Sequence, residues 1–425
     1  MTPLDKIIKE LCPNGVNEKT LSEVTVAVNI GINPRKFFKL NPDGADCFYV
    51  TVRELNGLQG VCEYDKTDKI NREAVRLINE RANIEKGDLL FSNTGTVGKM
   101  ALVLEKPEKW GVNEGIYVIK PDYKIVTSKY LFYYLSGNSA YREYSTKFTG
   151  STLKHVTQAA LLSIHIPIPP LPVQEEIVRI LDSFTELTAE LTAELTARKK
   201  QYEYYRDKLL APYQNIPMIE LGSVCEFVRG PFGGALKKEI FQPKGYAVYE
   251  QQHAIYRSLD FRYYIDEAKF IELKRFAVNS GDMIVSCSGT IGKTFVIPDN
   301  APKGIINQAL LKITPREGLN VFYLQYFFES TISKILNEVS RGGAIKNVPS
   351  VGELKAIKIP LPPLDVQKHL VQVLDNFDSI CSDLKIGLPA EIEARTKQYE
   401  YYRDKLLSFK ETPTYEQKKE ISKTE

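Results

Sequence analysis

Two short segments of this chain combine glycine, hydroxyl and lysine side chains in a spacing that could bind phosphate. They are SNTGTVGK at residues 92–99 and SCSGTIGK at residues 286–293. A phosphate-binding P-loop follows the pattern GxxxxGK[ST], but Asn93 and Cys287 stand where its first glycine belongs. Both segments therefore predict tight turns between two strands. A contact of Lys99, Lys293 or a nearby hydroxyl with phosphate is left as the alternative.

Other residue combinations that could support catalysis are incomplete. Asp266, Glu272 and Lys274 have a nuclease-like spacing, but Arg72 and Ile78 stand at the matching positions in the first half of the chain. The proline-rich segment IPIPPLP lacks the Asp/Asn-Pro-Pro-aromatic tetrad of amino-methyltransferases, and no GxGxxG follows a predicted strand. We therefore expect no catalytic site in this chain.

The cysteines and histidines are too scattered for a metal site. None of the six cysteines forms a CxxC pair, and the four histidines lie far apart in the sequence. We expect neither a zinc site nor a disulfide framework. Because 26% of the residues are charged and no apolar run approaches twenty residues, we expect a cytoplasmic globular protein without a membrane span.

The chain is organised around an internal repeat. The ten residues QYEYYRDKLL occur at 201–210 and again, unchanged, at 398–407. Upstream of each copy lies a matching proline-rich run, IHIPIPPLPVQ and IKIPLPPLDVQ. Proline does not fit inside a helix, so each copy predicts a long helix that starts after the run, at Val173 and at Asp365. Apolar residues at helical spacing then give each helix one stripe that needs a partner.

The first helix contains a smaller repeat of four residues. TAEL occurs at 188–191 and again at 192–195. Because four residues exceed the 3.6 of a helical turn, each unit advances the helix by ~6 Å and rotates it by ~40°. We interpret the run as a spacer of adjustable length. In the second helix, Pro389 removes a helical hydrogen bond, which predicts a kink or break there.

The regions before the two helices share a framework and differ between the framework residues. GDLLFSNTGTVGKMALVL in the first matches GDMIVSCSGTIGKTFVIP in the second, and Asn113 aligns with Asn307. Each region carries a net charge of +3, from 22 basic and 19 acidic groups in the first and 17 and 14 in the second. This charge weakly favours a polyanionic partner. Aromatic helices are expected at 128–144 and 321–339, and strands of the first region at 47–52, 89–91, 100–104 and 116–119.

These repeats predict an α+β fold with two duplicated α/β lobes separated by two long antiparallel helices. The helices would pack along their apolar stripes as a coiled-coil-like spacer, and the halves would be related by a pseudo-two-fold axis. The expected boundaries are lobes at 1–163 and 213–356, helical spacers at 164–212 and 357–410, and a disordered tail at 411–425.

Four features of the chain occur together in one known family. They are the Pro-Pro-Leu-x-x-Gln start of each helix, the TAEL quartets, the K-Q-Y-E-Y-Y-R-D-x-L-L helix end, and two divergent lobes with S-x-x-G-T-x-G-K. With these motifs the chain resembles the specificity subunit of type I DNA restriction-modification enzymes. The resemblance covers nearly the whole sequence.

The resemblance implies a non-catalytic subunit whose lobes are target-recognition domains. Each domain would read one half of a bipartite, asymmetric sequence in double-stranded DNA. The implied partners are two methyltransferase subunits that use S-adenosylmethionine and two restriction subunits with ATP- and Mg-dependent translocase activity, while this chain itself holds no cofactor. The alternative is a coiled-coil scaffold that presents two protein-interaction domains without DNA. Steeply salt-dependent binding to DNA would distinguish the DNA-reading subunit from the protein-only scaffold.

The expected DNA-facing surface comes from the two glycine turns and from a second loop in each lobe. Glycine, hydroxyl and cationic groups there suit contacts to phosphates and base edges, whereas a purely structural role of the turns is the alternative. The candidate DNA-binding residues are Ser92, Thr94, Lys99, Ser151, Lys154, Ser286, Lys293, Arg341, Lys346 and Asn347.

The two helix ends carry six tyrosines, more than one seam between two helices can bury. Tyrosine is favoured at protein interfaces because its ring is apolar and its hydroxyl is polar. Packing of half of these side chains in the core is the alternative. The candidate partner-binding residues are Tyr202, Tyr204, Tyr205, Tyr399, Tyr401 and Tyr402.

Overall fold

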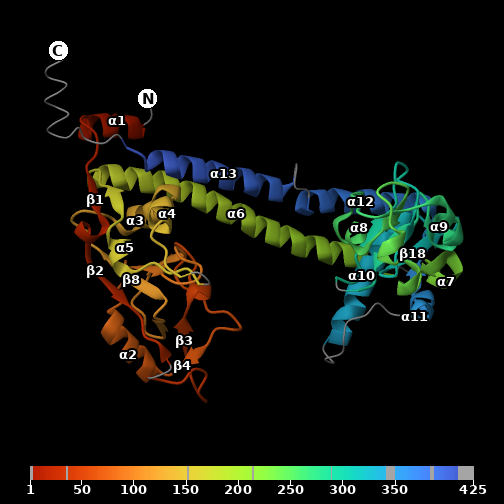
Figure 1. Cartoon of the computed structure of the whole chain (residues 1–425), viewed down its shortest axis with the longest axis horizontal. Coiled ribbons are helices and arrows are strands. Elements are labelled where there is room, and N and C mark those ends of the chain that lie inside the picture. The colour runs from red at the N-terminus through yellow and green to blue at the C-terminus, as the bar shows by residue number, and fades with distance from the viewer. Residues whose placement is uncertain are drawn as a thin grey trace, which may run out of the picture. The chain divides into compact units, whose positions relative to one another are not determined.

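The chain divides into two units, of which the first combines two segments far apart in the sequence and the second is one continuous segment (Figure 1). Unit 1 comprises Met1–Leu191 with Ile392–Glu425, and unit 2 comprises Thr192–Glu391. Each unit therefore holds one lobe, the start of the long helix that follows this lobe, and the end of the other long helix. The structure, a computed structural model, describes residues 3–34, 37–150, 153–212, 215–288, 290–340, 350–382 and 387–409.

Lobe 1 combines a four-stranded antiparallel sheet, a three-stranded mixed sheet and short helices. A two-stranded sheet joins the start of the lobe to its end. In chain order the elements are α1 (Pro3–Leu11), β1 (Glu18–Thr20), η1 (Leu21–Glu23), β2 (Thr25–Ile30), β3 (Cys47–Val50), η3 (Val52–Glu54), β4 (Lys69–Ile70), α2 (Arg72–Ala82), β5 (Leu89–Ser92), β6 (Met100–Leu102), β7 (Trp110–Val112), β8 (Ile116–Pro121), α3 (Ser128–Leu135), α4 (Asn138–Ser145), α5 (Gln158–Leu162) and β9 (His165–Pro167).

Lobe 2 repeats this plan with different lengths. Its elements are β10 (Met218–Glu220), α7 (Leu221–Val224), β11 (Cys225–Arg229), η4 (Gly233–Ala235), η5 (Lys238–Ile240), β12 (Tyr246–Tyr249), α8 (Gln251–Tyr256), β13 (Tyr264–Ile265), α9 (Glu267–Glu272), η6 (Lys274–Phe276), β14 (Ala277–Val278), β15 (Met283–Ser286), β16 (Thr294–Val296), β17 (Gly304–Ile306), β18 (Leu310–Pro315), α10 (Val321–Ser340), α11 (Val351–Ala356) and β19 (Lys358–Pro360). The long helices are α6 (Leu171–Leu209), α12 (Leu364–Ser382) and α13 (Leu388–Leu406).

The strand orders confirm the duplication of the lobes. The four-stranded sheet has the order β2-β8-β5-β6 in lobe 1 and β11-β18-β15-β16 in lobe 2. The second sheet has the order β4-β3-β7 in lobe 1 and β13-β12-β17-β14 in lobe 2. Within these sheets β3 pairs with β7, and β12 with β17, as parallel neighbours. Lobe 2 therefore extends the second sheet by the short strand β14.

The central strand of each lobe is apolar on both faces because both faces are covered. Successive side chains of a strand point to opposite faces. In β5, Leu89 and Phe91 belong to one hydrophobic core and Leu90 to another, and in β15 Met283 and Ile284 divide in the same way. One core lies against the long helices, and the other lies between the two sheets of the lobe.

The glutamine of each Pro-Pro-Leu-x-x-Gln motif fixes the start of its helix. Gln174 is fully buried, donates from Nε2 to the carbonyls of Ile125 and Pro169 at 2.9 Å, and accepts from the amide of Thr127. Gln367 repeats this arrangement at the start of α12. These bonds satisfy a buried side-chain amide at the junction between lobe and helix.

The predicted helix starts were wrong by one or two residues. Helix α6 begins at Leu171 instead of Val173, and α12 begins at Leu364 instead of Asp365. Pro172 therefore lies in the first turn of α6, where its missing N–H has no helical partner in any case. Helix α6 then continues without interruption through both TAEL quartets (Figure 1).

The aromatic helix of lobe 1 is broken, which the sequence did not predict. Helix α3 ends at Leu135 and α4 begins at Asn138. Between them, the Ser136 hydroxyl donates to the carbonyl of Phe132 at 2.8 Å, and Gly137 caps the second helix. Both residues favour such a break: a serine hydroxyl can bond to the backbone within a helix, and glycine has a low helix propensity. Helix α10 of lobe 2 is continuous, as predicted.

The other predictions for single elements are confirmed with small shifts. The predicted strands correspond to β3, β5, β6 and β8. Strand β3 ends at Val50 because Thr51 already caps the following 3-10 turn. The predicted break at Pro389 is confirmed, since α12 ends at Ser382 and α13 begins at Leu388. The predicted disordered tail lies outside the described residues.

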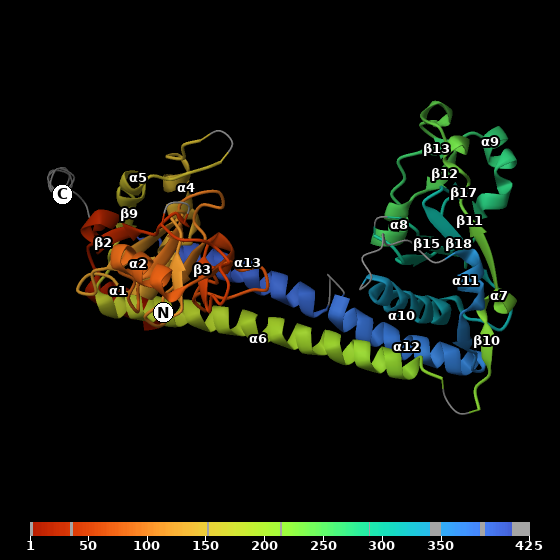
Figure 2. The ribbon, with the colours of Figure 1, turned by 90° about the horizontal axis from the view of Figure 1, so that it is seen from below.

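Each lobe is docked on its long helices by the same polar contacts. In unit 2, α10 lies beside α12 (Figure 2), and the hydroxyl of Tyr326 donates to Asp375 at 2.6 Å. In unit 1, the hydroxyl of Tyr133 donates to Asp182 at 2.7 Å. The repeated helix ends are held by their aspartates: Asp207 accepts from Ser330, and Asp404 accepts from Asn138.

Candidate nucleic-acid interface

The two glycine segments form turns between antiparallel strands with matching hydrogen bonds, as the sequence predicts. In lobe 1 the amide of Ser92 donates to the carbonyl of Lys99 at 2.9 Å, and the amide of Gly98 donates back to the carbonyl of Ser92 at 2.9 Å. In lobe 2 Ser286, Lys293 and Gly292 make the same bonds. Gly98 and Gly292 have φ values of 90° and 76°, which favour glycine.

The serine hydroxyls of these turns are used inside the turns. Ser92 is buried, and its Oγ donates to the carbonyl of Thr96 at 2.6 Å and accepts from the amide of Lys99 at 2.8 Å. Ser286 is buried with the matching contacts to Thr290 and Lys293. For these two candidates the geometry favours the structural role that the sequence left as the alternative.

The candidate cations lie on the surface around the turns. Lys99 is exposed, with Nζ 3.2 Å from the carbonyl of Arg53, and Lys293 is exposed as well. Lys154 is exposed, with its ammonium 5.6 Å from the centre of the Phe148 ring, and its carbonyl accepts from the amide of Gly95. The turn and the loop predicted from sequence are thus in contact in lobe 1.

Of the remaining candidate DNA-binding residues, only Thr94 lies in the part of the chain that the structure describes. Thr94 is partly exposed, and its hydroxyl donates to Oδ1 of Asn93 and lies 2.9 Å from Nδ1 of His155. The remaining candidates lie outside the described residues: Ser151, Arg341, Lys346 and Asn347.

Loops from four parts of lobe 1 meet at one end of its sheets. They follow β2, β3 and β5 and connect β7 to β8. The amide of Gly31 donates to the carbonyl of Ile116 at 3.3 Å, and the amide of Asn93 donates to the carbonyl of Gly115 at 2.8 Å. In lobe 2, loops at the equivalent positions meet in the same way. There the amide of Gly230 donates to the carbonyl of Leu310 at 3.0 Å.

Two aligned asparagines build an identical frame at the centre of these loops. The amide of Asn113 donates to Val50, and its Oδ1 accepts from the amide of Gly115 at 3.1 Å. The amide of Asn307 donates to Tyr249, and its Oδ1 accepts from the amide of Ala309 at 3.0 Å. The residue that follows each asparagine, Glu114 in lobe 1 and Gln308 in lobe 2, is therefore held on the same backbone frame.

The thiol of Cys287, beside the lobe 2 frame, is not reactive. Burial raises the pKa of the Cys287 thiol to about 11, and the charge of Arg229 only partly opposes this rise. The thiol is therefore protonated at neutral pH, whereas a nucleophilic cysteine needs a lowered pKa. Among the described residues, no group of three or more His, Cys, Asp or Glu side chains is placed to hold a metal ion.

The six tyrosines of the repeated helix ends fall into three pairs. Tyr202 and Tyr399 pack against the cores of lobes 2 and 1. Tyr205 stacks on Phe377 with ring centres 6.2 Å apart, and Tyr402 stacks on Phe184 at 5.5 Å.

The third pair is directed to solvent. Tyr204 is 62% exposed and Tyr401 is 61% exposed, and each makes an edge contact with the tyrosine that follows it. The helix ends therefore bury part of the six rings, and Tyr204 and Tyr401 are the most exposed ring of each copy.

Comparison with known proteins places the chain in a family. Residues 13–198 and 214–394 each match the family described as type I restriction modification DNA specificity domain. The chain belongs to this family. Each specificity domain thus covers one lobe and most of the helix that follows it. In the part of the chain that the structure describes, no helix is long and apolar enough to cross a membrane.

Named relatives of these specificity domains agree with the assignment. A Haemophilus influenzae protein, provisionally named type I restriction enzyme specificity subunit S.HindORF215P, is 35% identical over 71% of this chain and 77% of its own length. The EcoR124I/EcoR124II specificity subunit of Escherichia coli is 35% identical over 59% of this chain and 64% of its own length. A solved structure on complex assembly and conformational transition of the type I R-M system contains a chain with the same fold. Its TM-score is 0.64 at 20% identity, over 93% of this chain and 98% of that one.

The specificity domains expose side chains at the loop cluster that sequence reasoning missed. Glu114 and Gln308 are exposed at the centre of the two frames, and Arg229 is exposed at the end of β11. Phe232, in the loop after β11, is 96% exposed. The alignment of Asn113 with Asn307 was visible in the sequence, but only the structure shows that the next residue lies at the tip of a loop among other loops.

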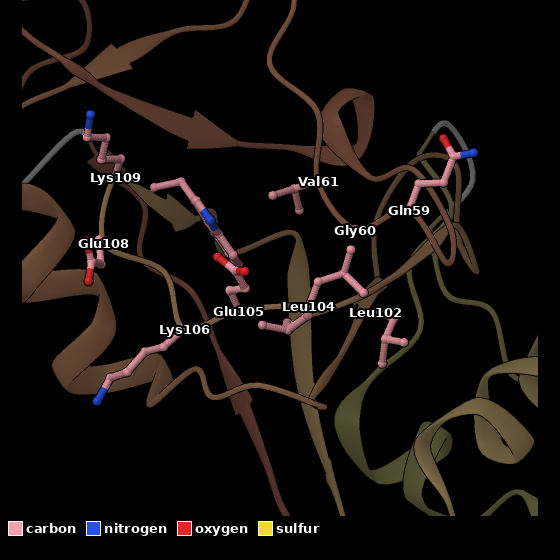
Figure 3. A pocket seen from close by; sticks show the side chains of 11 residues that line it. Gln59, Gly60, Val61, Leu102, Leu104, Glu105, Lys106, Glu108 and Lys109 are labelled. Carbon is pink, nitrogen blue, oxygen red and sulfur yellow. The ribbon is translucent and has the colours of Figure 1, made fainter.

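A groove in the first specificity domain does not resemble a catalytic site. It has a volume of about 650 Å³ and lies along the edge strand β6, between residues 59–61 and residues 102–110. Figure 3 shows that the side chains of Lys106 and Lys109 point in different directions, so they do not form a joint phosphate site. Glu105 and Glu108 balance their charge.

Proposed function

We propose that this chain is the DNA-reading subunit of a type I restriction-modification complex. The observation that carries the proposal is the duplicated loop cluster: both lobes keep one backbone frame but expose different side chains on it. Glu114 and Gln308 are the central example. Two readers with a common scaffold and different exposed groups are what a bipartite, asymmetric target requires, because base edges are distinguished by the side chains that reach them.

In this proposal the chain binds double-stranded DNA and has no catalytic activity of its own. Methyl transfer from S-adenosylmethionine, and ATP- and Mg-dependent translocation and cleavage, belong to partner subunits in the cytoplasm. Lys99, Lys154 and Lys293 supply positive charge beside the frames, and phosphate contacts of this kind fix the register of a protein on the duplex. The exposed rings of Tyr204 and Tyr401 are two equivalent docking points, which supports two methyltransferase subunits per chain.

The test is binding to a random-sequence duplex library by the chain assembled with its methyltransferase. We expect enrichment of two short half-sites separated by an unread spacer, and an affinity that falls steeply with salt because counterions are released from phosphates. No enrichment together with weak salt dependence would favour a protein-only scaffold. The chain alone, incubated with DNA and labelled S-adenosylmethionine, is expected to transfer no methyl groups.

A further inference from the structure

We propose that Glu114 and Gln308 are equivalent base-reading residues, one for each half-site, and that their chemical difference makes the target asymmetric. This inference rests on the proposed function and deepens it. The two residues occupy one position in a duplicated frame, so a comparison between them removes the effect of the backbone. What remains is a carboxylate in lobe 1 and an amide in lobe 2.

The equivalence of the two positions extends to two neighbouring loops in each lobe. Gly31 follows β2 and Gly230 follows β11, and each lies close to the carbonyl of the frame asparagine. A Cβ added at Gly31 would lie 2.2 Å from Asn113 O, and one added at Gly230 would lie 1.8 Å from Asn307 O. On the other side, the amides of Asn93 and Cys287 donate to the carbonyls of Gly115 and Ala309. Each tip is thus clamped between two loops, and this clamping fixes the backbone from which the side chain of Glu114 or Gln308 projects.

The carboxylate of Glu114 favours a contact with a base over a contact with the DNA backbone, because phosphates would repel it. Glu114 is exposed in a lobe whose net charge is +3, with Lys99 and Lys154 on neighbouring loops. An acidic residue next to a duplex loses Coulomb energy unless it accepts hydrogen bonds from the DNA. In the major groove the donors are the amino groups of cytosine and adenine.

The Glu114 carboxylate is already oriented by the protein. Its Oε1 accepts from Nδ2 of Asn33 at 2.6 Å. Burial first, and then the charge of Glu114 and a hydrogen bond with it, raise the pKa of the Tyr49 phenol, whose hydroxyl also donates to the carbonyl of Ile32 at 2.6 Å. Two carboxylate oxygens offer about four acceptor positions, so the donors Asn33 and Tyr49 together still leave capacity for a base amino group.

Gln308 presents the complementary chemistry. It is exposed, and within the described part of the chain no hydrogen bond from another side chain reaches its amide. A glutamine that offers both a donor and an acceptor can pair with adenine at N6 and N7. We therefore assign an amino-bearing base, cytosine or adenine, to Glu114 and adenine to Gln308. Gln251, the first residue of α8, accepts from the hydroxyl of Ser288 at 2.7 Å through its Oε1.

The test is a reciprocal exchange, Glu114→Gln and Gln308→Glu, in the full chain assembled with its methyltransferase. Each exchange keeps the size of the side chain, and Gln at 114 still accepts from Asn33. After selection from a random-sequence duplex library, each variant is expected to change base preference about tenfold at one position of one half-site. Glu108→Gln and Gln242→Glu, exposed positions outside the frames, are the matched controls and are expected to select the original sequence.

The outcomes separate this inference from the function on which it rests. If both exchanges select the original sequence, or weaken binding equally for all sequences, Glu114 and Gln308 do not read bases although the chain reads DNA. If the unaltered chain enriches no bipartite sequence, the proposed function itself is wrong. The half-site of the unchanged lobe serves as an internal control, because its retention in a variant reports a folded protein.

Discussion

At the scale of single residues, the loop cluster separates side chains that build the surface from side chains that it offers to a partner. Ser92 and Ser286 are buried and complete their turns. Lys154 is exposed on the neighbouring loop, where its ammonium contacts the ring of Phe148. A lysine of this kind suits contact with phosphate, since it moves without disturbing the core.

We expect Lys154→Ala to weaken DNA binding and to lower the salt dependence of the affinity. Loss of one phosphate contact reduces the slope of log K against log salt by about 0.9. The free energy of unfolding should change by less than ~0.5 kcal/mol, as for most surface substitutions. Fluorescence anisotropy on a duplex target across a salt series measures both effects.

Lys86→Ala is the matched control for this substitution. Lys86 is exposed in the same lobe but precedes β5, whereas the turn at residues 92–99 follows it. An equal loss of slope in both variants would mean that the lobe attracts DNA through its overall charge and that Lys154 makes no specific contact.

How far the sequence predicts a residue's role depends on whether the role is local. The turn geometry follows from glycines and hydroxyls that are neighbours in the chain, so SNTGTVGK and SCSGTIGK predict it correctly. The meeting of this turn with the loop that carries Asn113 depends on β8 lying beside β5. Nothing in the local sequence encodes that neighbourhood, and Glu114 was therefore missed.

At the scale of elements, each repeated helix end is fixed by one aspartate. Asp207 accepts from Ser330 Oγ at 2.8 Å and pairs with Lys334 Nζ at 3.0 Å. Burial opposes ionisation of this carboxyl, but the hydrogen bonds from Ser330, Lys334 and Arg206 outweigh it and hold its pKa below the ordinary value of 3.8. Asp404 takes the equivalent place in unit 1, where Asn138 Nδ2 donates to it at 2.6 Å.

We expect Asp207→Asn to lower the free energy of unfolding of unit 2 by about 1 kcal/mol at neutral pH, because part of the carboxylate is exposed and screened. A lowered folded-state pKa means that the stabilisation is complete above pH 3.8 and is lost as the pH falls through the folded-state value. The difference in thermal midpoint between wild type and variant should therefore shrink at acidic pH. A constant difference from pH 7 to pH 3 would contradict this assignment, and Asp43→Asn, at an exposed site, is the control.

The same helix ends are expected to bind the methyltransferase subunits through Tyr204 and Tyr401. Both rings are exposed, and each leans on a tyrosine that stacks on a phenylalanine, so a partner would meet a rigid apolar surface. Changing each to Ala should remove one bound methyltransferase, and the double variant should remove both. Native mass spectrometry of the assembled complex counts the subunits.

Tyr64→Ala, an exposed tyrosine of lobe 1, controls for general loss of surface aromatics. Full occupancy in the folded double variant would exclude these rings as the docking points. The sequence identified all six tyrosines as candidates, but it could not select among them. Which of the rings are covered depends on Phe184 and Phe377, far away in the chain.

At the scale of the whole molecule, the two repeated helix ends are exchanged between the two units. Unit 1 contains the second copy of the repeated helix end, and unit 2 contains the first. The repeat predicts two long helices, but the exchange follows only from tertiary contacts such as those of Asp207 and Asp404. Each lobe is therefore supported by the helix end that belongs to the other copy of the repeat.

The TAEL run lies where helix α6 passes from unit 1 to unit 2, between Leu191 and Thr192. A further quartet would lengthen the helix by ~6 Å, nearly two base pairs of rise, and rotate it by ~40°, close to the twist of one base pair. Because each lobe must still face a groove, we expect rotation to dominate. Inserting a third TAEL after Leu195 should then keep both half-sites and widen the unread spacer by one base pair, or two at most.

Sequencing of the methylated sites in cells that express the insertion variant with its methyltransferase measures the spacer directly. Inserting seven residues, which restores the helical phase to within ~20°, is the matched comparison because it lengthens the helix by ~10 Å with little rotation. If rotation sets the spacing, the quartet changes the spacer and the seven-residue insertion abolishes or weakens recognition. Altered half-sites, or an unchanged spacer with the quartet, would mean that α6 does not set the distance between the half-sites. Helices α12 and α13 would then be the elements that set it.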